Sequence, residues 1–319
     1  MARDGRMLAA SFASEVRLWQ ALVMSPVRAI FAVLLGLSLA CGIAARASAQ
    51  AVTEAVTEAG AVDLHLVLAV DVSWSMDPDE QRLQRDGYVD ALRDAAVIKA
   101  IQSGPAGRIA VTYFEWAGAD IQFMVVPWTI IDGAAAAHRL ADTLAERRIS
   151  RHRMTSISSA LEYAHRLLKD APGSAARRVV DVSGDGPNNG GTSPVTLARD
   201  VLLADGVIIN GLPIMLKSGN EGGFGTGFGQ DIADLDDYYS NCVIGGPGSF
   251  TIPIRKSEEF ATATRQKLLQ EISWLPAPLP APRVMKAQFA PVLPAPRQGA
   301  YDCLVGERNW RRYYLDGAR

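Results

Sequence analysis

An apolar run, LHLVLAV over residues 64–70, ends abruptly at the charged residue Asp71. A continuous run of this kind suits a strand that is buried on both faces, as in a parallel sheet. A helix start follows closely, because Asp77 precedes Pro78 and Glu80 stands three residues after Asp77. This order is typical of a capped helix N-terminus. The chain is therefore expected to place a helix directly after a buried strand.

Strands and helices alternate along the rest of this region. The predicted strands cover residues 64–70, 108–116, 121–128, 177–183, 207–214 and 249–254, and the predicted helices cover residues 78–101, 133–147, 156–169, 194–204, 231–239 and 257–274. Strands that alternate with helices of ten or more residues are typical of a parallel sheet covered on both faces. We therefore expect one doubly wound α/β domain over residues 62–274, with a mostly parallel six-stranded sheet.

Residues 1–49 have the pattern of a secretory signal peptide. An uncharged stretch over residues 29–45 follows Arg28, and Ala47 to Ala49 form a small-residue cleavage site before Gln50. An uncleaved anchor is an alternative, but a membrane span needs about 20 apolar residues. Lipidation at Cys41 is a second alternative, but the preceding residues Ser38, Leu39 and Ala40 do not stand in the order of a lipobox. We expect cleavage, export to the periplasm or beyond, and no membrane insertion afterwards.

Segments of different composition flank the domain. Residues 50–61 repeat AVTE and are expected to form a flexible lead-in. Residues 275–297 contain seven prolines, which predict a semi-rigid polyproline linker. Residues 298–319 form a short tail that mixes arginines with aromatic residues. This tail is either a flap docked on the domain or an independent partner-binding segment.

The charge of the chain argues against a nucleic-acid protein. The formal net charge is -2 for the whole sequence, and the leader contains five arginines against two acidic residues, so the mature chain is near -5. Nucleic-acid-binding domains are usually strongly basic. We therefore expect no nucleic-acid partner.

Polar residues gather where the predicted strands end. Asp71, Ser73 and Ser75 follow the first strand, Thr155 stands at a loop-to-helix junction, and Asp185 follows the fourth strand. Ligands of doubly wound sheets lie outside the carboxyl ends of the strands. Two carboxylates and three hydroxyls without His or Cys suit a hard cation, and Mg²⁺ fits best. The alternative is that the carboxylates only cap loops and the hydroxyls satisfy backbone groups.

These residues resemble the metal-ion-dependent adhesion site of the von Willebrand factor A domain. The resemblance rests on D-x-S-x-S after the first strand, a separate Thr and a later Asp in a Ser-Gly-Asp-Gly turn, and it spans about residues 62–274. The strings LAVDVSWSM, VTYFEWAG, VSGDGPNN and CVIGGPGSF suggest a closer likeness to bacterial secreted proteins of unknown function that carry this domain.

The resemblance implies a metal and a function. It implies Mg²⁺, with Mn²⁺ or Ca²⁺ as alternatives, held by Asp71, Ser73 and Ser75. Thr155 would act directly or through water, and Asp185 mainly through water. It also implies a non-enzymatic protein-binding module, in which an acidic residue of a partner protein completes the metal shell.

The chain departs from the common pattern of that site at two positions. Trp74 replaces the small residue often found between the serines, and Gly184 is inserted before Asp185. Trp74 either contacts a partner or packs on its own loop, and both interpretations stay open. The insertion puts the distance between Asp185 and the metal in question.

The other motifs do not favour an enzyme. The glycine-rich run over residues 222–229 has no G-x-G-x-x-G register, and the serines have no identifiable histidine base. A metal-assisted hydrolase at the same site would need a general base that the sequence does not offer. A structural envelope protein with a vestigial metal site is the remaining alternative.

Cys242 and Cys303 are the two cysteines of the mature chain. In an oxidising compartment they are expected to form a disulfide across the proline-rich linker, and the alternative is two buried thiols. Closing a loop of about 60 residues stabilises a fold by roughly 4 kcal/mol in the chain-entropy model.

Overall fold

The computed structural model describes residues 60–216, 232–273 and 301–312. The predicted signal peptide, the proline-rich linker, the glycine-rich run and nearly all of the lead-in lie outside these ranges. Within the described part of the chain, no helix combines the length and apolar character needed to cross a membrane.

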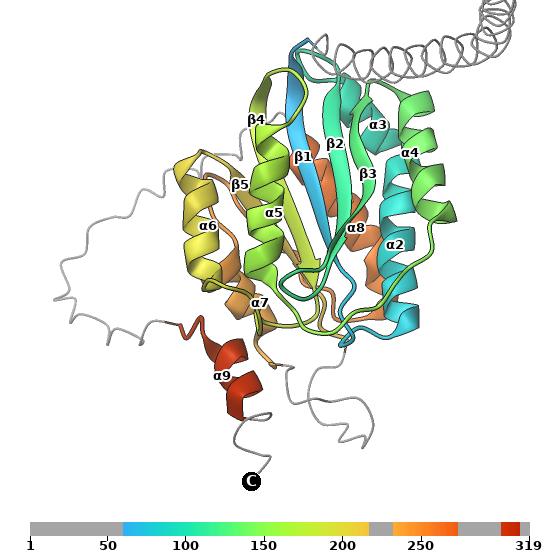
Figure 1. The fold of residues 1–319 in the computed structure, drawn as a ribbon. Coiled ribbons are helices and arrows are strands. Elements are labelled where there is room, and N and C mark those ends of the chain that lie inside the picture. The colour runs from blue at the N-terminus through green and yellow to red at the C-terminus, as the bar shows by residue number, and fades with distance from the viewer. Residues whose placement is uncertain (1–59, 217–231, 274–300, 313–319) are drawn as a thin grey trace, which may run out of the picture. The chain divides into compact units, whose positions relative to one another are not determined.

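Five strands form one mixed sheet in the order β3-β2-β1-β4-β5 (Figure 1). The central strand β1 (Val62–Asp71) pairs in parallel with β2 (Ile109–Trp116) on one side and with β4 (Ala175–Gly184) on the other. Next to β4 lies β5 (Ile208–Pro213), also parallel, whereas β3 (Gln122–Ile131) runs antiparallel to β2. The prediction of an α/β fold is confirmed, and every residue of β1 is buried, as the apolar run indicates.

The prediction of six strands is wrong for the described residues. The segment 249–254 lies beside β5 but makes only two isolated parallel bridges, through Thr251 and Ile254. Ile252 and Ile254 donate backbone hydrogen bonds to the Gly211 and Pro213 carbonyls of β5. Pro213 has no N–H with which to donate to the Ile252 carbonyl in return. This proline of β5 therefore interrupts the ladder between the two bridges.

Helices cover both faces of the sheet (Figure 1). One face packs against α2 (Pro78–Arg93), α3 (Ala95–Gln102), α4 (Ala134–Glu146) and α8 (Phe260–Ile272), and the other against α5 (Ile157–Lys169), α6 (Val195–Ala204) and α7 (Leu235–Tyr238). Side chains of β1 alternate between the two cores: Leu66 and Leu68 face the first, and Val67 and Ala69 the second. Shorter elements are the π-helix Tyr239–Val243, the 3-10 turn Ser257–Glu259 and α9 (Val305–Arg311).

The capped helix start predicted after the first strand is confirmed. Asp77 Oδ1 accepts hydrogen bonds from the backbone N–H groups of Asp79 and Glu80, both at 2.8 Å, and the Glu80 carboxylate accepts one from the Asp77 N–H at 2.7 Å. The helix is shorter than predicted, because Asp94 ends α2 and caps α3 by accepting from the Ala96 N–H. The Asp77 cap fixes the end of the loop that follows β1.

A buried charge cluster joins α8 to the sheet. The Lys267 ammonium lies 2.7 Å from Asp181 on β4 and also contacts Glu271, and all three side chains are buried. Asn210 donates to Glu271 at 3.0 Å, and Tyr88 donates to Asp181 at 3.2 Å. Burial, with the nearby Asp181 charge, raises the pKa of Glu271 to about 7 even though Lys267 opposes the shift.

Candidate metal centre

The candidate site lies at the carboxyl ends of β1 and β4. Asp71 is the last residue of β1 and Gly184 the last of β4, and the two strands pair in parallel with Val70 opposite Ser183. The loops that follow them therefore leave the sheet side by side. This is the edge at which the sequence predicts a ligand site.

A series of hydrogen bonds connects four of the five predicted residues. Asp71 Oδ1 accepts from the Ser73 N–H at 2.7 Å, and the Ser73 and Ser75 hydroxyls are hydrogen-bonded at 2.7 Å. The Ser75 hydroxyl then donates to Asp185 Oδ1 at 2.5 Å. Asp71 and Asp185 are 0% and 8% exposed, so two carboxylates from distant parts of the sequence lie close together with little access to solvent.

Thr155, the fifth predicted residue, lies beside the Asp185 loop. A Cβ placed on Gly186 would be 3.9 Å from the Thr155 hydroxyl. The Thr155 N–H donates to the side chain of Asn189, and the Asn189 N–H donates back to the Thr155 carbonyl, both at 2.8 Å. Paired hydrogen bonds of this kind hold the two loops in fixed register.

Two asparagines that the sequence analysis left without a role hold the site loops. Asn189 binds Thr155, and the Asn188 side chain accepts from the Ser158 N–H at 3.0 Å in the first turn of α5. The Asn188 N–H donates to the Tyr238 hydroxyl at 3.1 Å. Both asparagines belong to the string VSGDGPNN, but nothing local in a sequence shows which loops an asparagine will connect.

Tyr239 is a second residue that sequence reasoning missed. A Cβ on Gly184 would lie 2.8 Å from Asp71 Oδ2 and 3.0 Å from the Tyr239 hydroxyl. Burial raises the pKa of Tyr239 well above its ordinary value, and the nearby charges of Asp71 and Asp185 add to this. The phenol therefore stays protonated, and among the described residues it has no hydrogen-bond acceptor.

The close approach at Gly184 also gives a physical reason for the inserted glycine. The space that a side chain would need is filled by the Asp71 carboxylate and the Tyr239 hydroxyl. Despite the insertion, Asp185 remains within hydrogen-bonding distance of Ser75. The insertion therefore does not remove Asp185 from the cluster.

The donor set has the chemistry of a site for a small hard cation. Its side-chain donors are two carboxylates and three hydroxyls, all oxygen. In the ranges that the structure describes, no group of three or more His, Cys, Asp and Glu could hold a metal. A cation bound here would therefore depend on hydroxyl and water ligands as well as carboxylates, and Mg²⁺ commonly keeps several waters.

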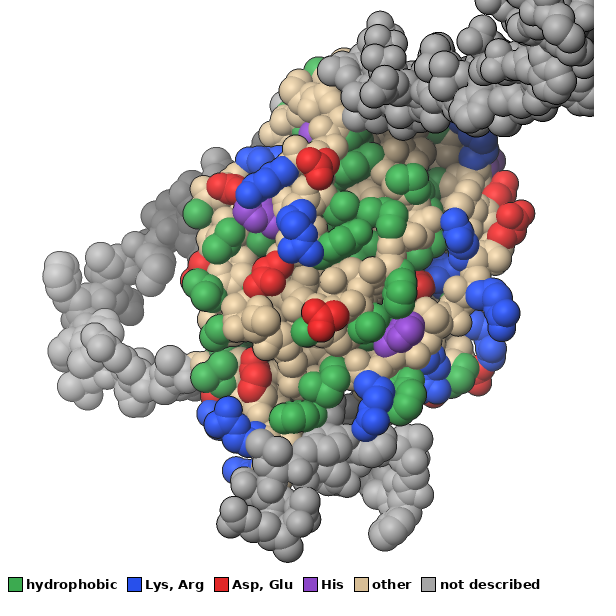
Figure 2. Space-filling model, in the orientation of Figure 1, with side chains coloured by type: hydrophobic (Ala, Val, Ile, Leu, Met, Phe, Trp, Pro, Cys, Tyr) green, Lys and Arg blue, Asp and Glu red, His purple; other side chains and the backbone are tan. Residues whose placement is uncertain are grey.

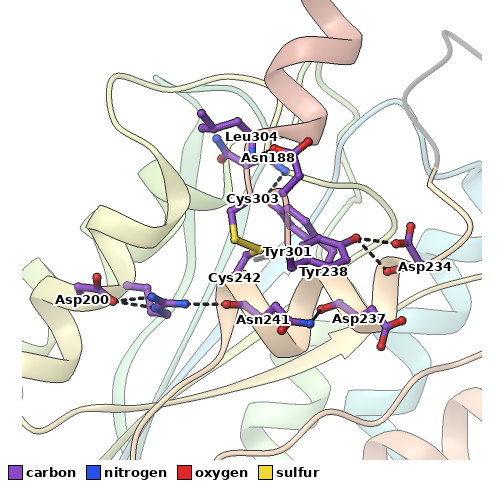
Figure 3. The surroundings of a disulfide bond; sticks show 12 residues. Asn188, Asp200, Asp234, Asp237, Tyr238, Asn241, Cys242, Tyr301, Cys303 and Leu304 are labelled. Atoms are coloured by element: carbon purple, nitrogen blue, oxygen red, sulfur yellow. Dashed lines mark hydrogen bonds and ion pairs between the residues drawn. A yellow bond between two sulfur atoms is a disulfide. The ribbon is translucent and has the colours of Figure 1, made fainter. Parts of the chain in front are cut away.

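A C-terminal segment packs against the same loops. The predicted disulfide between Cys242 and Cys303 is confirmed, and it anchors residues 301–312 to the domain (Figure 3). Beyond it, the Asn188 side chain donates to Glu307 at 2.6 Å. A Cβ on Gly306 would be only 2.1 Å from the Asn188 carbonyl oxygen, so only glycine fits there. This part of the tail is a docked flap that supports the Asp185 loop from outside.

Trp74 stands on the surface beside the site. Its side chain is 48% exposed, and the Arg153 guanidinium lies 5.3 Å from the centre of its ring. About half of the Trp74 side chain therefore faces solvent, and the Arg153 side chain covers part of the ring.

The family model described as "Protein of unknown function (DUF1194)" matches residues 61–276, more than half of the chain. This chain belongs to DUF1194. The matched region contains all five residues of the DUF1194 candidate site and ends before Cys303. No curated protein matches this DUF1194 chain.

Several solved structures are similar to this DUF1194 protein. Proximal thread matrix protein 1 from the mussel byssus is 16% identical with a TM-score of 0.45, over 67% of this chain and 46% of its own. BatB from Bacteroides thetaiotaomicron is 16% identical with a TM-score of 0.43, over 65% of this chain and 98% of its own. A von Willebrand factor type A structure from Catenulispora acidiphila is 16% identical with a TM-score of 0.44, over 66% and 43%. The chain spans less than half the length of the mussel protein.

Proposed function

We propose that this DUF1194 protein is an exported, non-enzymatic protein-binding module that uses a divalent cation, Mg²⁺ by preference, to engage an acidic residue of a partner protein. The proposal is carried by one observation, the series of hydrogen bonds that joins Asp71 to the Ser73 N–H, the Ser73 hydroxyl to Ser75, and Ser75 to Asp185. Its resemblance to a metal-ion-dependent adhesion site supplies the mode of binding.

Each residue of the site has a proposed role. Asp71, Ser73 and Ser75 hold the cation, Thr155 ligates it directly or through water, and Asp185 acts mainly through water. A bound cation that is not fully neutralised by its ligands supplies a position at which a carboxylate from outside can bind. With Asp71 as the only carboxylate that coordinates directly, the direct ligands do not neutralise the Mg²⁺, and it keeps an open position for that partner.

Neighbouring residues keep these ligands in place. The Tyr239 phenol stays protonated beneath Asp71, where it can donate a hydrogen bond to the carboxylate or to a water. Asn189 fixes the position of Thr155 through two hydrogen bonds. Its side chain accepts from the Thr155 N–H, and its backbone N–H donates to the Thr155 carbonyl. Outer contacts of this kind commonly change metal affinity 10–100-fold when they are removed.

Export is proposed from the signal-peptide pattern over residues 1–49 together with the disulfide. Disulfides persist in oxidising compartments such as the periplasm and are rare in the cytosol. The bridge between Cys242 and Cys303 therefore supports a location outside the cytoplasm.

Calorimetric titration of the disulfide-bonded protein with Mg²⁺ tests the metal site. We expect one Mg²⁺ to bind the wild type, binding to be lost in Asp71→Ala, and binding to be retained in Asp142→Ala, which removes an exposed carboxylate on α4. Absence of binding to the wild type at millimolar Mg²⁺ overturns the proposal and favours a vestigial site. Mn²⁺ and Ca²⁺ are titrated in the same way to rank the cations.

Partner capture tests the function that depends on the metal. Immobilised protein is expected to retain partners from a periplasmic extract in Mg²⁺ and to release them in EDTA. Capture that is unaffected by both EDTA and Asp71→Ala contradicts the proposed mode of binding. Ester or phosphoester hydrolysis above the level of Asp71→Ala would instead indicate an enzyme.

A further inference from the structure

An arginine-rich loop lies directly beside the candidate metal centre. Residues 147–153 read RRISRHR, with four arginines, one histidine and no acidic residue. The loop ends two residues before Thr155, and all four arginines are exposed. A mature chain near -5 thus concentrates positive charge next to one proposed metal ligand.

Hydrogen bonds fix this loop against the Asp71–Ser75 segment. The His152 N–H donates to the Val72 carbonyl at 3.0 Å, and His152 forms an isolated bridge with Ser73. The Arg151 guanidinium donates to the carbonyl oxygens of Trp74 and Met76 at 2.9 and 2.6 Å. The positive charge is therefore held at the rim of the site.

Aromatic and apolar side chains extend the same rim. Arg153 stacks over the exposed Trp74 ring, and the His152 ring packs at 4.8 Å against Phe123, which is 41% exposed. On the face that Figure 2 shows, hydrophobic side chains and charged side chains of both signs are interspersed. Exposed Trp and Arg side chains are the types most enriched among residues that dominate binding energy.

Within the part of the chain that the structure describes, the arginines of this loop are not neutralised by carboxylates. Arg93, Arg199, Arg255 and Arg265 each pair with an aspartate elsewhere on the surface. Among the described residues, no carboxylate forms an ion pair with an arginine of residues 147–153. Guanidinium groups bind carboxylates through paired hydrogen bonds, so the loop can bind acidic groups from outside.

We infer that the partner is a protein segment with several acidic residues: one binds at the metal centre, and its neighbours bind the Arg148, Arg151 and Arg153 rim beside Trp74. This inference rests on the proposed function and narrows it, because a lone carboxylate would leave the rim unused. Complementary charge at a rim increases the association rate and makes it sensitive to salt.

Fluorescence anisotropy with defined peptides tests the inference on the full disulfide-bonded protein. The probes are a labelled peptide of ten glutamates and a Gly/Ser peptide of equal length with one glutamate. In Mg²⁺ we expect the first to bind at least about tenfold more tightly, with an affinity that falls as salt rises. A single-stranded oligonucleotide of ten nucleotides serves as a non-protein polyanion.

The test variant is Arg148→Ala with Arg153→Ala, which keeps Arg151 and its hydrogen bonds to the loop. It is expected to weaken binding of the ten-glutamate peptide about tenfold and to flatten the salt dependence. The control is Lys99→Ala with Lys169→Ala, which removes two exposed positive charges near the amino ends of the strands, away from the candidate site. It is expected to change binding less than about twofold.

The outcomes separate the inference from the proposed function. Wild-type affinity in the arginine variant, with release by EDTA, overturns the inference and leaves the proposed function standing. Binding that survives both EDTA and Asp71→Ala contradicts the proposed function and overturns the inference with it. Tighter binding of the oligonucleotide than of the acidic peptide overturns the assignment of a protein partner.

Discussion

The Ser75 hydroxyl donates a hydrogen bond of 2.5 Å to Asp185, which lies 110 positions later in the chain. This contact connects the loop after β1 to the loop after β4. Ser75 also binds Ser73, so one hydroxyl holds both halves of the candidate site.

Ser75→Ala is therefore expected to weaken Mg²⁺ binding by about tenfold or more, since it removes both a proposed ligand and the link between the two loops. Calorimetric titration measures the change. Ser193→Ala is the matched control, because it removes a hydroxyl-to-carboxylate hydrogen bond of 2.6 Å to Glu162, outside the candidate site. Equal effects of the two substitutions would show that Ser75 has no special role.

Gly184→Ala is expected to destabilise the fold by about 1–3 kcal/mol, because a Cβ forced into filled space displaces its neighbours. Those neighbours are the Asp71 carboxylate and the Tyr239 hydroxyl, at 2.8 and 3.0 Å from the added atom. Urea unfolding measures the stability, and Mg²⁺ titration is expected to show weaker binding.

Gly186→Ala provides the control for that substitution. Its Cβ would meet nothing closer than the Thr155 hydroxyl at 3.9 Å, which is an ordinary contact. If Gly184→Ala and Gly186→Ala unfold at the same urea concentration, the close packing around Gly184 does not matter for stability.

The parts of the fold that the sequence predicts correctly depend on local patterns. The buried run of β1 and the capping box at Asp77 need only neighbouring residues to be recognised. The sequence also predicts a sixth strand from the residues over 249–254, but Pro213 on the neighbouring β5 lacks the N–H that a continuous ladder needs. The composition of residues 249–254 alone does not show which strand they will lie beside.

The site shows the same division. Asp71, Ser73, Ser75 and Asp185 were predicted because the carboxyl ends of parallel strands bring their loops together. Tyr239 was missed because its place next to Asp71 depends on how a distant π-helix packs. The roles of Asn188 and Asn189 likewise depend on contacts 30 or more positions away.

Replacing both Cys242 and Cys303 with serine is expected to lower the free energy of unfolding by about 4 kcal/mol, because the bridge closes a long loop. The same change frees the segment that places Glu307 against Asn188. Urea unfolding of the wild type and the double variant, each with and without reductant, measures the loss. If the reductant also lowers the free energy of unfolding of the double variant, its effect on the wild type does not arise from breaking this bridge.

The Glu271 carboxyl is expected to make stability depend on pH. It shares a buried site with Asp181 and Lys267, so two carboxylates lie beside one ammonium. Burial first, and the charge of Asp181 second, raise the pKa of Glu271 to about 7 in the folded protein, above its ordinary value of 4.5. Because the folded state binds this proton more tightly than the unfolded chain, its contribution is complete below pH 4.5 and is lost as pH rises through 7.

Glu271→Gln keeps the shape of the side chain without the titration, so the variant is expected to lack the part of the stability loss that Glu271 contributes between pH 5 and pH 8. Urea unfolding at intervals across this range measures the slope for each protein. Glu258→Gln removes an exposed carboxyl in the turn before α8 and is expected to keep the wild-type slope. If Glu271→Gln and the wild type lose stability in parallel, Glu271 does not hold a proton in the folded state, and the buried cluster carries a net negative charge.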